Sequence, residues 1–385
     1  MVIDIGSGSV GAAIVSLGEG ELKQPLIWSY RERMPAKTEA TESEAEKRIA
    51  TTVMNVFLEL GSNGLKTLRA SGVTAEIKRV QVAISSPWCY TVTRTIHMQA
   101  ERPFKVTHEL LDELIDKASD QAKSHINQNL VVEKLSLTTL SDSTVNISEN
   151  GYVVHKPFKD NIKKLSVSQL MAMSSQNLYK AIEAGAEKVI PEAKVVTNTF
   201  VYFYYRALAN LYSETAEACL IDVTSEATEL GIIRRGVLEG ATHIKVGTST
   251  LAREIAAATN MTAEEGLGYL RQRGGEATRM LKAEHQTKVD EIVMNYENKL
   301  VELFQRTGDA LSLPRTIFLH TDHRQETFLH EVVKRAAKKA TETEHSIHLV
   351  TSKFFAPEGS PDSALLLSAY VLRNRLYEPN YFKWS

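Results

Sequence analysis

Residues able to hold phosphate groups gather in a short turn near the start of the chain. The turn reads Gly6-Ser7-Gly8-Ser9 and closely follows a carboxylate, Asp4. Glycines let backbone amides approach phosphate oxygens, serine hydroxyls add donors, and an aspartate can hold Mg²⁺ through water. This turn therefore predicts a phosphate-binding hairpin with a metal ion at its base.

A second turn with a similar composition begins at Asp222. Hydroxylated residues follow in the order Asp222-Val-Thr-Ser-Glu-Ala-Thr228, before the apolar run LGIIRRG. Further along, Gly247 precedes Thr248 at the start of a helical pattern, and a helix N-terminus presents free amides to an anion. We expect the two hairpins to face each other across a cleft that holds a nucleotide.

The residues expected to contact the nucleotide come from both turns and from the helix start. They are Asp4, Gly6, Ser7, Gly8, Ser9, Asp222, Thr224, Ser225, Thr228, Gly247 and Thr248. Asp4 and Asp222 are the expected Mg²⁺ ligands, because hard cations prefer carboxylate oxygens. No catalytic residue is predicted, since no Ser/His/Asp order or Cys/His neighbourhood indicates an activated nucleophile.

Two other interpretations of the first turn stay open. Gly6-Ser-Gly-Ser-Val-Gly11 matches the GxGxxG fingerprint of dinucleotide sites, but that fingerprint requires a helix after the turn. The β-like run AAIVSL follows instead, and Asp4 would face a pyrophosphate unless a metal lay between them. The simpler alternative is that a hairpin needs glycine whether or not it binds a ligand.

Composition limits the class of protein and its partners. With 385 residues, 43% of them hydrophobic, the chain is long enough for at least two cores. A formal net charge of −2 gives no basic excess for nucleic acid. Cys89 and Cys219 are too few and too far apart for a zinc site or a disulfide framework. The sequence shows no apolar run long enough to span a membrane and no signal peptide, which predicts a cytoplasmic protein.

Two clusters of chemically versatile residues have simpler structural explanations. His320 and His323 flank Asp322, but this pair has no third and fourth ligand nearby in the sequence, so we expect a solvated loop. Pro87-Trp88-Cys89-Tyr90 is either an exposed partner-binding patch or part of a core. We favour the core, because this run joins two strand patterns.

Hydrophobic periodicity predicts the elements that position these turns. Apolar β-branched runs on both sides of the first turn indicate a hairpin, and the spacing of Ile49, Val53 and Phe57 indicates a helix with a stop at Gly61. The other predictions are strands at 80–86 and 90–98, a helix at 107–126, a hairpin around Asn150-Gly151, a helix at 166–185, three strands between 218 and 247, helices over 262–309, and alternating strands and helices beyond 316.

Three segments resemble motifs of the FtsA/PilM branch of the actin-like ATPases. They are DIGSGSVGAAIV at 4–15, ACLIDVTSEATELGIIRRG at 218–236 and HIKVGTSTLAREIA at 243–256. The resemblance implies an α/β protein with a two-lobed actin-like (ribonuclease H-like) fold and a small inserted α+β domain similar to SHS2 domains. The implied domains are a first lobe at 1–78, the inserted domain at 79–190, and a second lobe at 191–385 that includes a helical subdomain at 250–312.

The sequence departs from this family at positions near the nucleotide. Gly11 replaces a lysine of the first hairpin, and Thr224-Ser225-Glu226 replaces glycines of the second. The loop Leu319-His-Thr-Asp-His323 lacks two family glycines, and Asn198 stands where related ATPases carry an acid. A carboxylate such as Glu226, about 4 Å from a phosphate charge, would cost on the order of 4 kcal/mol. We predict that ATP and Mg²⁺ bind weakly or not at all, with negligible turnover.

The resemblance also implies a function in assembly. It implies a scaffold at the inner face of a bacterial membrane, which links a membrane-bound or cytoskeletal protein partner to a cell-division or type IV pilus machine. Partner binding is expected through the inserted domain, and copies of the chain are expected to form oligomers or filaments. The tail residues Tyr381, Phe382 and Trp384 suit a membrane interface or a partner groove.

Two enzymes are the alternatives. The first is an active actin-like ATPase whose ATP binding and hydrolysis drive its assembly. The second is a sugar or acetate kinase on the same fold, which would need a carboxylate in the cleft between the lobes. The sequence offers no candidate for that carboxylate, so the scaffold is the favoured interpretation.

Overall fold

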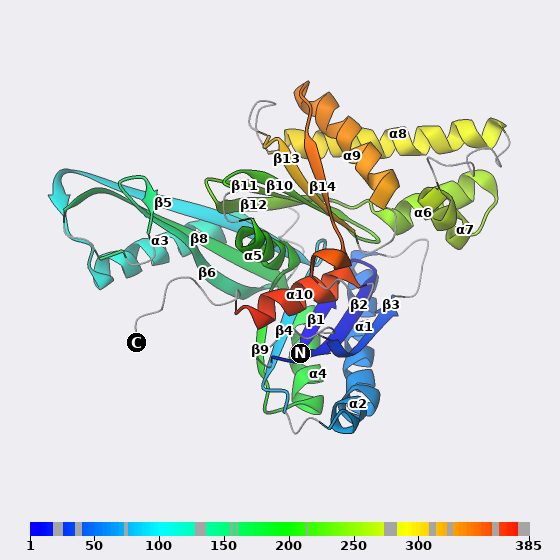
Figure 1. Ribbon diagram of the computed structural model, residues 1–385, viewed down its shortest axis with the longest axis horizontal. Coiled ribbons are helices and arrows are strands. Elements are labelled where there is room, and N and C mark those ends of the chain that lie inside the picture. Colours follow the sequence, from blue (N-terminus) through cyan, green and yellow to red (C-terminus); the bar gives the residue numbers. More distant parts are fainter. Residues whose placement is uncertain are drawn as a thin grey trace.

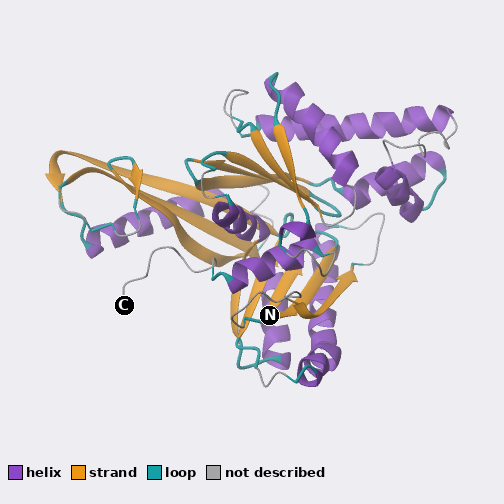
Figure 2. Cartoon of the chain, in the orientation of Figure 1, coloured by secondary structure: helices purple, strands orange, loops and turns teal. Residues whose placement is uncertain are grey.

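Two lobes and a long lateral extension make up the computed structural model of the protein (Figure 1). Helices cover the sheets of both lobes, while the extension consists mainly of long strands (Figure 2). The structure describes residues 1–17, 26–34, 41–72, 76–127, 136–154, 157–158, 161–212, 215–272, 283–307, 313–321, 326–355 and 362–375.

A five-stranded sheet forms the first lobe. Its strands lie in the order β3 (Leu26–Arg33), β2 (Ser9–Val15), β1 (Val2–Ile5), β4 (Arg79–Ile84) and β9 (Lys194–Thr199). The central strand β1 is antiparallel to β2 and parallel to β4. Every residue of β1 and β2 is buried, as expected for strands that are covered on both faces.

Helices on both faces of this sheet account for that burial. The helices are α1 (Glu42–Glu59), a π-helical turn (Leu60–Gly64), α2 (Leu65–Ala70), α4 (Gln176–Val189) and α10 (Ser363–Arg373). The apolar faces of α1 and α4 pack against Ile3 and Ile5 of β1. On the other face, Leu365 of α10 packs against Val2 and Ala13. The alternating side chains of β1 and β2 thus enter two separate cores.

Nine strands form the second sheet, which runs from the second lobe into the extension. Their order is β14 (Ser346–Val350), β13 (Thr316–Thr321), β10 (Ala218–Val223), β11 (Thr228–Arg234), β12 (Val237–Ile244), β5 (Cys89–Phe104), β8 (Ile162–Ser175), β6 (Leu137–Glu149) and β7 (Tyr152–Val153). Lobe and extension join where Gly240 of β12 pairs with Val92 of β5. The Thr93 hydroxyl strengthens this junction by donating to the Leu238 carbonyl at 2.6 Å.

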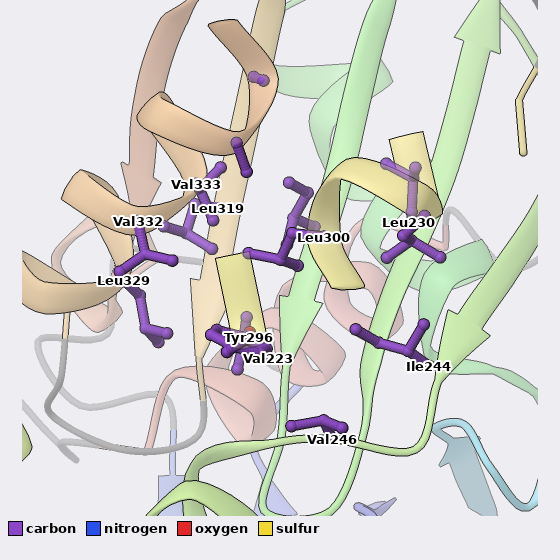
Figure 3. Close-up of a cluster of buried hydrophobic side chains, with 14 of the residues drawn as sticks. Val223, Leu230, Ile244, Val246, Tyr296, Leu300, Leu319, Leu329, Val332 and Val333 are labelled. Carbon is purple, nitrogen blue, oxygen red and sulfur yellow. The ribbon is translucent and has the colours of Figure 1, made fainter. Parts of the chain in front are cut away.

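The helices of the second lobe enclose a large apolar core beside β10 and β13 (Figure 3). They are α6 (Thr248–Thr259), α7 (Ala263–Gln272), α8 (Ala283–Gln305) and α9 (Glu326–Thr341). Helix α5 (Phe200–Leu211) packs in a separate core, and a 3₁₀ turn (Ser352–Phe354) follows β14. Tyr296 and Leu300 of α8 meet Val223 and Leu230, which flank the β10–β11 turn. Burial of these side chains fixes the position of that turn.

The extension consists of β5, β6, β7 and β8 with α3 (His108–Asn127) packed on one face. Leu111 and Leu114 of α3 contact Leu165 and Val167 of β8 in a small core of their own. The chain enters the extension from β4 and returns to the first lobe through α4, and β5 also pairs with β12. The extension is therefore attached to both lobes.

One predicted helix is wrong, because residues 166–175 belong to strand β8 and only α4, from Gln176, is helical. Leu170 and the two methionines of this segment favour a helix locally. Tertiary pairing overrides that preference, since β8 forms long antiparallel ladders with both β5 and β6. The Ser175 hydroxyl, which accepts from the Leu178 amide, marks the true helix start.

The predicted helix stop at Gly61 is also wrong. The helical path continues through the π turn into α2, and ends near Ser71. Gly61 lies against Val189 of α4, where a Cβ would come within 3.2 Å of that side chain. The glycine therefore permits close helix packing and does not end a helix.

The α/β class and the arrangement in two lobes agree with the sequence prediction. In both sheets, parallel pairs of central strands carry helices on their faces, as in other proteins of this class. Within the residues that the structure describes, no helix combines the length and the apolar character needed to cross a membrane.

Candidate functional site at the facing hairpins

Hairpin 1, the turn Gly6–Gly8 between β1 and β2, lies at the end of the first lobe that faces the second lobe. Burial of β1 holds the neighbouring Asp4 in the interior, with 2% of the residue exposed. The Gly6 amide donates to the Ser9 carbonyl at 2.9 Å and closes the turn. The predicted hairpin is therefore present at the predicted residues.

Hairpin 2, the turn Thr224–Ala227, connects β10 and β11. The amide and the hydroxyl of Thr224 donate to the Ala227 carbonyl at 2.9 and 3.1 Å. The first turn of α6 docks on this hairpin, because the amides of Thr248 and Ser249 donate to two of its carbonyls at 3.0 and 2.8 Å. Hairpin 2 thus uses the helix N-terminus that the sequence assigned to an anion.

Gly247 makes this docking sterically feasible. A Cβ at Gly247 would lie 2.1 Å from the Thr224 carbonyl oxygen, closer than any side chain tolerates. Thr228 also points inward, since its hydroxyl donates to the Val246 carbonyl at 2.8 Å. Gly247, Thr248 and Thr228, all predicted nucleotide contacts, therefore make contacts within the second lobe.

The two hairpins touch each other directly. The hydroxyls of Ser7 and Thr224 are 2.7 Å apart, and the Glu226 amide donates to the Ser7 hydroxyl at 2.6 Å. A Cβ at Gly8 would lie 2.6 Å from the Cβ of Ser225. The hydroxyls of Ser7 and Thr224, which were expected to bind phosphate, bind the opposite hairpin here.

Asp4 is paired with an arginine. The Arg31 guanidinium of β3 donates to Asp4 at 2.7 Å, to Asp362 at 2.6 and 3.0 Å, and to the Ser9 hydroxyl at 2.9 Å. A Cβ at Gly11 would lie 2.7 Å from the guanidinium, so the glycine makes room for it. The cation that seemed lost at Gly11 is therefore replaced by Arg31, which the sequence analysis did not identify.

Asp222 has a different partner. Its Oδ1 lies 2.7 Å from Nδ1 of His320, whose Nε2 lies 2.8 Å from the Ser363 hydroxyl. His320 is 1% exposed at the end of β13, so the expectation of a solvated loop is wrong for this residue. His320 belongs to strand β13, in which it follows the buried apolar residues Ile317, Phe318 and Leu319. His323 and Asp322 lie outside the described residues.

Asp222, His320 and Ser363 are connected in the order found in serine hydrolases. A hydrolase also needs space for a substrate beside the serine and the histidine. The rings of Phe200 and Tyr204 pack against His320, with centroids 5.1 and 6.0 Å away. We assign the connection a structural role, because it ties β10 and β13 to the first residue of α10.

The N-terminus of α10 joins the two aspartates. Asp362 caps the helix by accepting from the Leu365 amide at 3.0 Å and also binds Arg31. The next residue, Ser363, binds His320. A continuous polar path thus runs from Asp4 in the first lobe to Asp222 in the second.

Glu226, which was expected to repel phosphate, is neutralised by Arg253 of α6. Two hydrogen bonds of 2.6 Å connect the guanidinium to the carboxylate, and the Thr250 hydroxyl donates to it at 2.9 Å. The carboxylate is thus held against α6. The backbone of Glu226 still occupies the space beside Ser7, because its amide donates to the Ser7 hydroxyl at 2.6 Å.

A buried acid that the sequence analysis missed lies beside Asp222. Glu229 of β11 is directly opposite Asp222 in the sheet, is 3% exposed, and accepts from the Ser86 hydroxyl at 2.8 Å. Burial, and to a smaller extent the charge of Asp222, raises the pKa of Glu229 to about 8. The sequence could have pointed to Glu229, because it is a glutamate next to the apolar run of a predicted strand.

The pKa values of Asp4 and Asp362, the two carboxylates that bind Arg31, are shifted in opposite directions. Burial raises the pKa of Asp4 to about 6, although Arg31 acts against this rise. Burial would also raise the pKa of Asp362, but the Arg31 guanidinium and the Leu365 amide hold it below its ordinary value. Both carboxylates are ionised at neutral pH and share one guanidinium.

These contacts do not fit a Mg²⁺-bound nucleotide. A magnesium ion needs oxygen ligands without a competing cation, but Asp4 faces Arg31. Phosphates need free amides, but the hairpins and α6 bind each other. Asn198 replaces the expected acid, and its side chain accepts from the Thr199 amide at 2.8 Å. No metal-dependent or phosphate-dependent step is therefore assigned to these residues.

A cavity of about 510 Å³ opens beside the hairpins, between the lobes and the base of the extension. Of the predicted nucleotide contacts, Ser7, Gly8 and Ser225 line it. Trp88, which was expected in a core, is half-buried at its wall, and its indole N–H donates to the Gly6 carbonyl at 3.0 Å. The cavity extends away from Asp4 and Asp222, which are not among its lining residues.

Comparison with known proteins identifies the fold as actin-like. No family model and no curated protein matches the sequence. The structure of a PilM–PilN type IV pilus biogenesis complex is similar over 98% of both chains, with 12% identity and a TM-score of 0.59. The ethanolamine utilization protein EutJ from Carboxydothermus hydrogenoformans is 9% identical over 98% of this chain and 89% of that chain, with a TM-score of 0.46. A Bacteroides thetaiotaomicron protein with an actin-like ATPase fold and unknown function is 13% identical over 95% and 94%, with a TM-score of 0.40.

Proposed function

We propose that this chain is an actin-like scaffold of the FtsA/PilM type that works without a nucleotide cycle. The observation that carries the proposal is the direct contact of the two hairpins, with Ser7 bound to both Thr224 and the Glu226 amide. In an actin-like ATPase the nucleotide would have to separate these groups. Here the side chains themselves connect the lobes.

The ion pair of Asp4 with Arg31 supports the same conclusion. A buried carboxylate that already has a cation gains little from Mg²⁺, and displacing the guanidinium would leave Arg31 to Asp362 alone. The polar path through α10 then holds the lobes together by residues of the chain. A scaffold benefits from such an arrangement, because its shape does not depend on ATP.

The proposed partner is a membrane-bound or cytoskeletal protein. Similarity to PilM in its complex with PilN supports a protein partner, and the extension of β5 to β8 and α3 projects away from the two lobes (Figure 1). We propose that it corresponds to the inserted SHS2-like domain at 79–190, and that the protein acts peripherally at a membrane, in cell division or pilus assembly. Oligomers or filaments of the chain are part of this proposal.

The alternative is an active actin-like ATPase, which the presence of Asp4 and Asp222 at the ends of β1 and β10 favours. Thermal unfolding with and without millimolar Mg-ATP discriminates between the two. A ligand at about 100 times its Kd stabilises the native state by about 2.7 kcal/mol.

The scaffold predicts no change in Tm beyond that caused by magnesium chloride and sodium sulfate at matched ionic strength. A second protein, with Thr224→Gly, Ser225→Gly and Glu226→Gly together, restores the glycines of the family and serves as a comparison. A concentration-dependent rise in Tm of the wild-type chain, together with phosphate release that Asp222→Ala abolishes, would refute the proposal.

A further inference from the structure

We infer that the cavity beside the hairpins binds a small aromatic zwitterion, of the class of the aromatic amino acids. This site is separate from partner binding by the extension and does not depend on the proposed function. Its volume of about 510 Å³ lies within the range of about 300–1,000 Å³ typical of small-molecule sites. The inference rests on an aromatic wall and on unpaired charges of both signs.

Residues at the junction between first lobe and extension form the apolar wall. Pro87, Trp88, Tyr90 and Leu137 line the cavity there. The hydrogen bond from the Trp88 indole to the Gly6 carbonyl satisfies the nitrogen and fixes the ring. A fixed indole offers an aromatic ligand a stacking surface at little entropic cost.

Among the residues that the structure describes, four cations and four carboxylates line the cavity, and half of them pair with each other. Arg253 binds Glu226 at 2.6 Å, and Lys245 binds Glu42. The residues that are left are Arg33, Arg48, Glu46 and Glu264.

These four side chains have no ion-pair partner among the described residues. Arg48 and Glu46 belong to α1, Arg33 ends β3, and Glu264 belongs to α7. Arg48 and Glu46 are half-buried, and Glu46 accepts a hydrogen bond from the Ser175 hydroxyl. Because Arg48 and Glu46 are partly desolvated, a ligand charge of opposite sign would stabilise each of them, and the exposed Arg33 and Glu264 offer further contacts at the rim.

One ligand satisfies both signs when it carries a carboxylate and an ammonium group. A planar carboxylate suits the fork of an arginine, and an ammonium suits a glutamate. The aromatic body of the same ligand fits against Trp88. Phosphate esters suit the cavity less well, because hairpin 2 already uses the free amides of α6 and four carboxylates line the walls.

Isothermal titration of the full-length chain with L-tryptophan and two matched analogues tests this inference. L-Tryptophanamide lacks the carboxylate, and N-acetyl-L-tryptophan lacks the ammonium group. L-Tryptophan should bind, and each analogue should bind at least about tenfold more weakly, because each loses one charge-assisted contact.

Two variants connect the binding to the cavity. Arg48→Gln should bind L-tryptophan about as weakly as the wild type binds L-tryptophanamide. Arg69→Gln, on the exposed end of α2 away from the cavity, is the matched control and should bind like the wild type. Melting curves of both variants exclude loss of fold as the cause.

Three results would each overturn the inference. They are no binding of L-tryptophan at millimolar concentration, equal binding of L-tryptophan and both analogues, and unchanged binding by Arg48→Gln. Equal binding would indicate a purely apolar pocket. None of these results affects the Mg-ATP experiment, since that experiment concerns the hairpins.

Discussion

The two hairpins have the same place in their sheets but satisfy their aspartates in different ways. In hairpin 1, Asp4 shares the charged Arg31 guanidinium with Asp362. In hairpin 2, Asp222 binds the buried His320 and lies opposite Glu229, whose pKa is raised to about 8. The first hairpin is an ionic site, while the second lies beside a buried acid, Glu229, whose raised pKa favours the protonated form at neutral pH.

The difference extends to the turns. Hairpin 1 keeps small residues, and Gly8 and Gly11 leave room for Ser225 and Arg31. Hairpin 2 reaches across the gap through the Thr224 hydroxyl and the Glu226 amide. One hairpin thus makes space and the other fills it, which explains how two turns of similar composition join without a ligand between them.

The largest expected effect comes from removing the charge of hairpin 1. Arg31→Ala leaves Asp4 and Asp362 without their shared cation, and should lower the free energy of unfolding by about 3–5 kcal/mol. Urea denaturation measures this loss. Arg234→Ala removes an exposed pair with Glu239 and should cost less than about 1 kcal/mol.

A double variant separates charge from packing. Asp4→Asn in the Arg31→Ala background removes one of the two orphaned carboxylates and should recover part of the lost stability. If Arg31→Ala costs no more than Arg234→Ala, the ionic character of hairpin 1 contributes little, and the contrast between the hairpins disappears.

A pH-dependent effect is expected from hairpin 2. The pKa of Glu229 is about 8 in the folded chain and about 4.5 when unfolded, so the native state binds more protons between these values. The contribution of Glu229 to the free energy of unfolding is therefore fully present below about pH 4.5 and is lost as the pH rises through about 8. Glu229→Gln keeps an acceptor for Ser86 and should remove this fall, a gain of about 2 kcal/mol near pH 6 that grows by about 1.4 kcal/mol per pH unit up to about pH 8.

Urea denaturation of the wild type and Glu229→Gln at several pH values measures the difference. Asp4 also lowers stability as the pH rises from about 4 to about 6, because its folded pKa is raised in the same direction. That fall should persist in Glu229→Gln. Parallel stability curves for the two proteins above pH 6 would mean that Glu229 does not titrate in this range.

The smallest effect concerns the contact between the hairpins. Ser7→Ala and Thr224→Ala each remove one hydroxyl of the 2.7 Å pair, and a double-mutant cycle should give a coupling energy of about 1 kcal/mol. Ser7→Ala should cost more than Thr224→Ala, because it leaves the Glu226 amide without its acceptor. After Thr224→Ala the Ala227 carbonyl still accepts from the backbone amide of residue 224. A coupling energy near zero would show that the turns touch without stabilising each other.

Local sequence patterns were sufficient for the hairpins and the fold class. Apolar runs on both sides of small residues predict two-stranded turns, and β1–β2 and β10–β11 are such turns. Local patterns were insufficient for β8, because the helix preference of residues 166–175 is overridden by pairing with two other strands. Strand pairing is a long-range property that a local window does not contain.

The sequence alone determined which residues lack a side chain and which carry charge: Gly8, Gly11, Asp4 and Asp222 could all be selected from their types and spacing. Only the tertiary structure decided their partners. Arg31 follows Asp4 by 27 positions and His320 follows Asp222 by 98, and these distances along the chain are closed by β2–β3 and β10–β13 pairing. Because burial and charge pairing depend on neighbours in space, the sequence did not reveal which residue pairs with each aspartate.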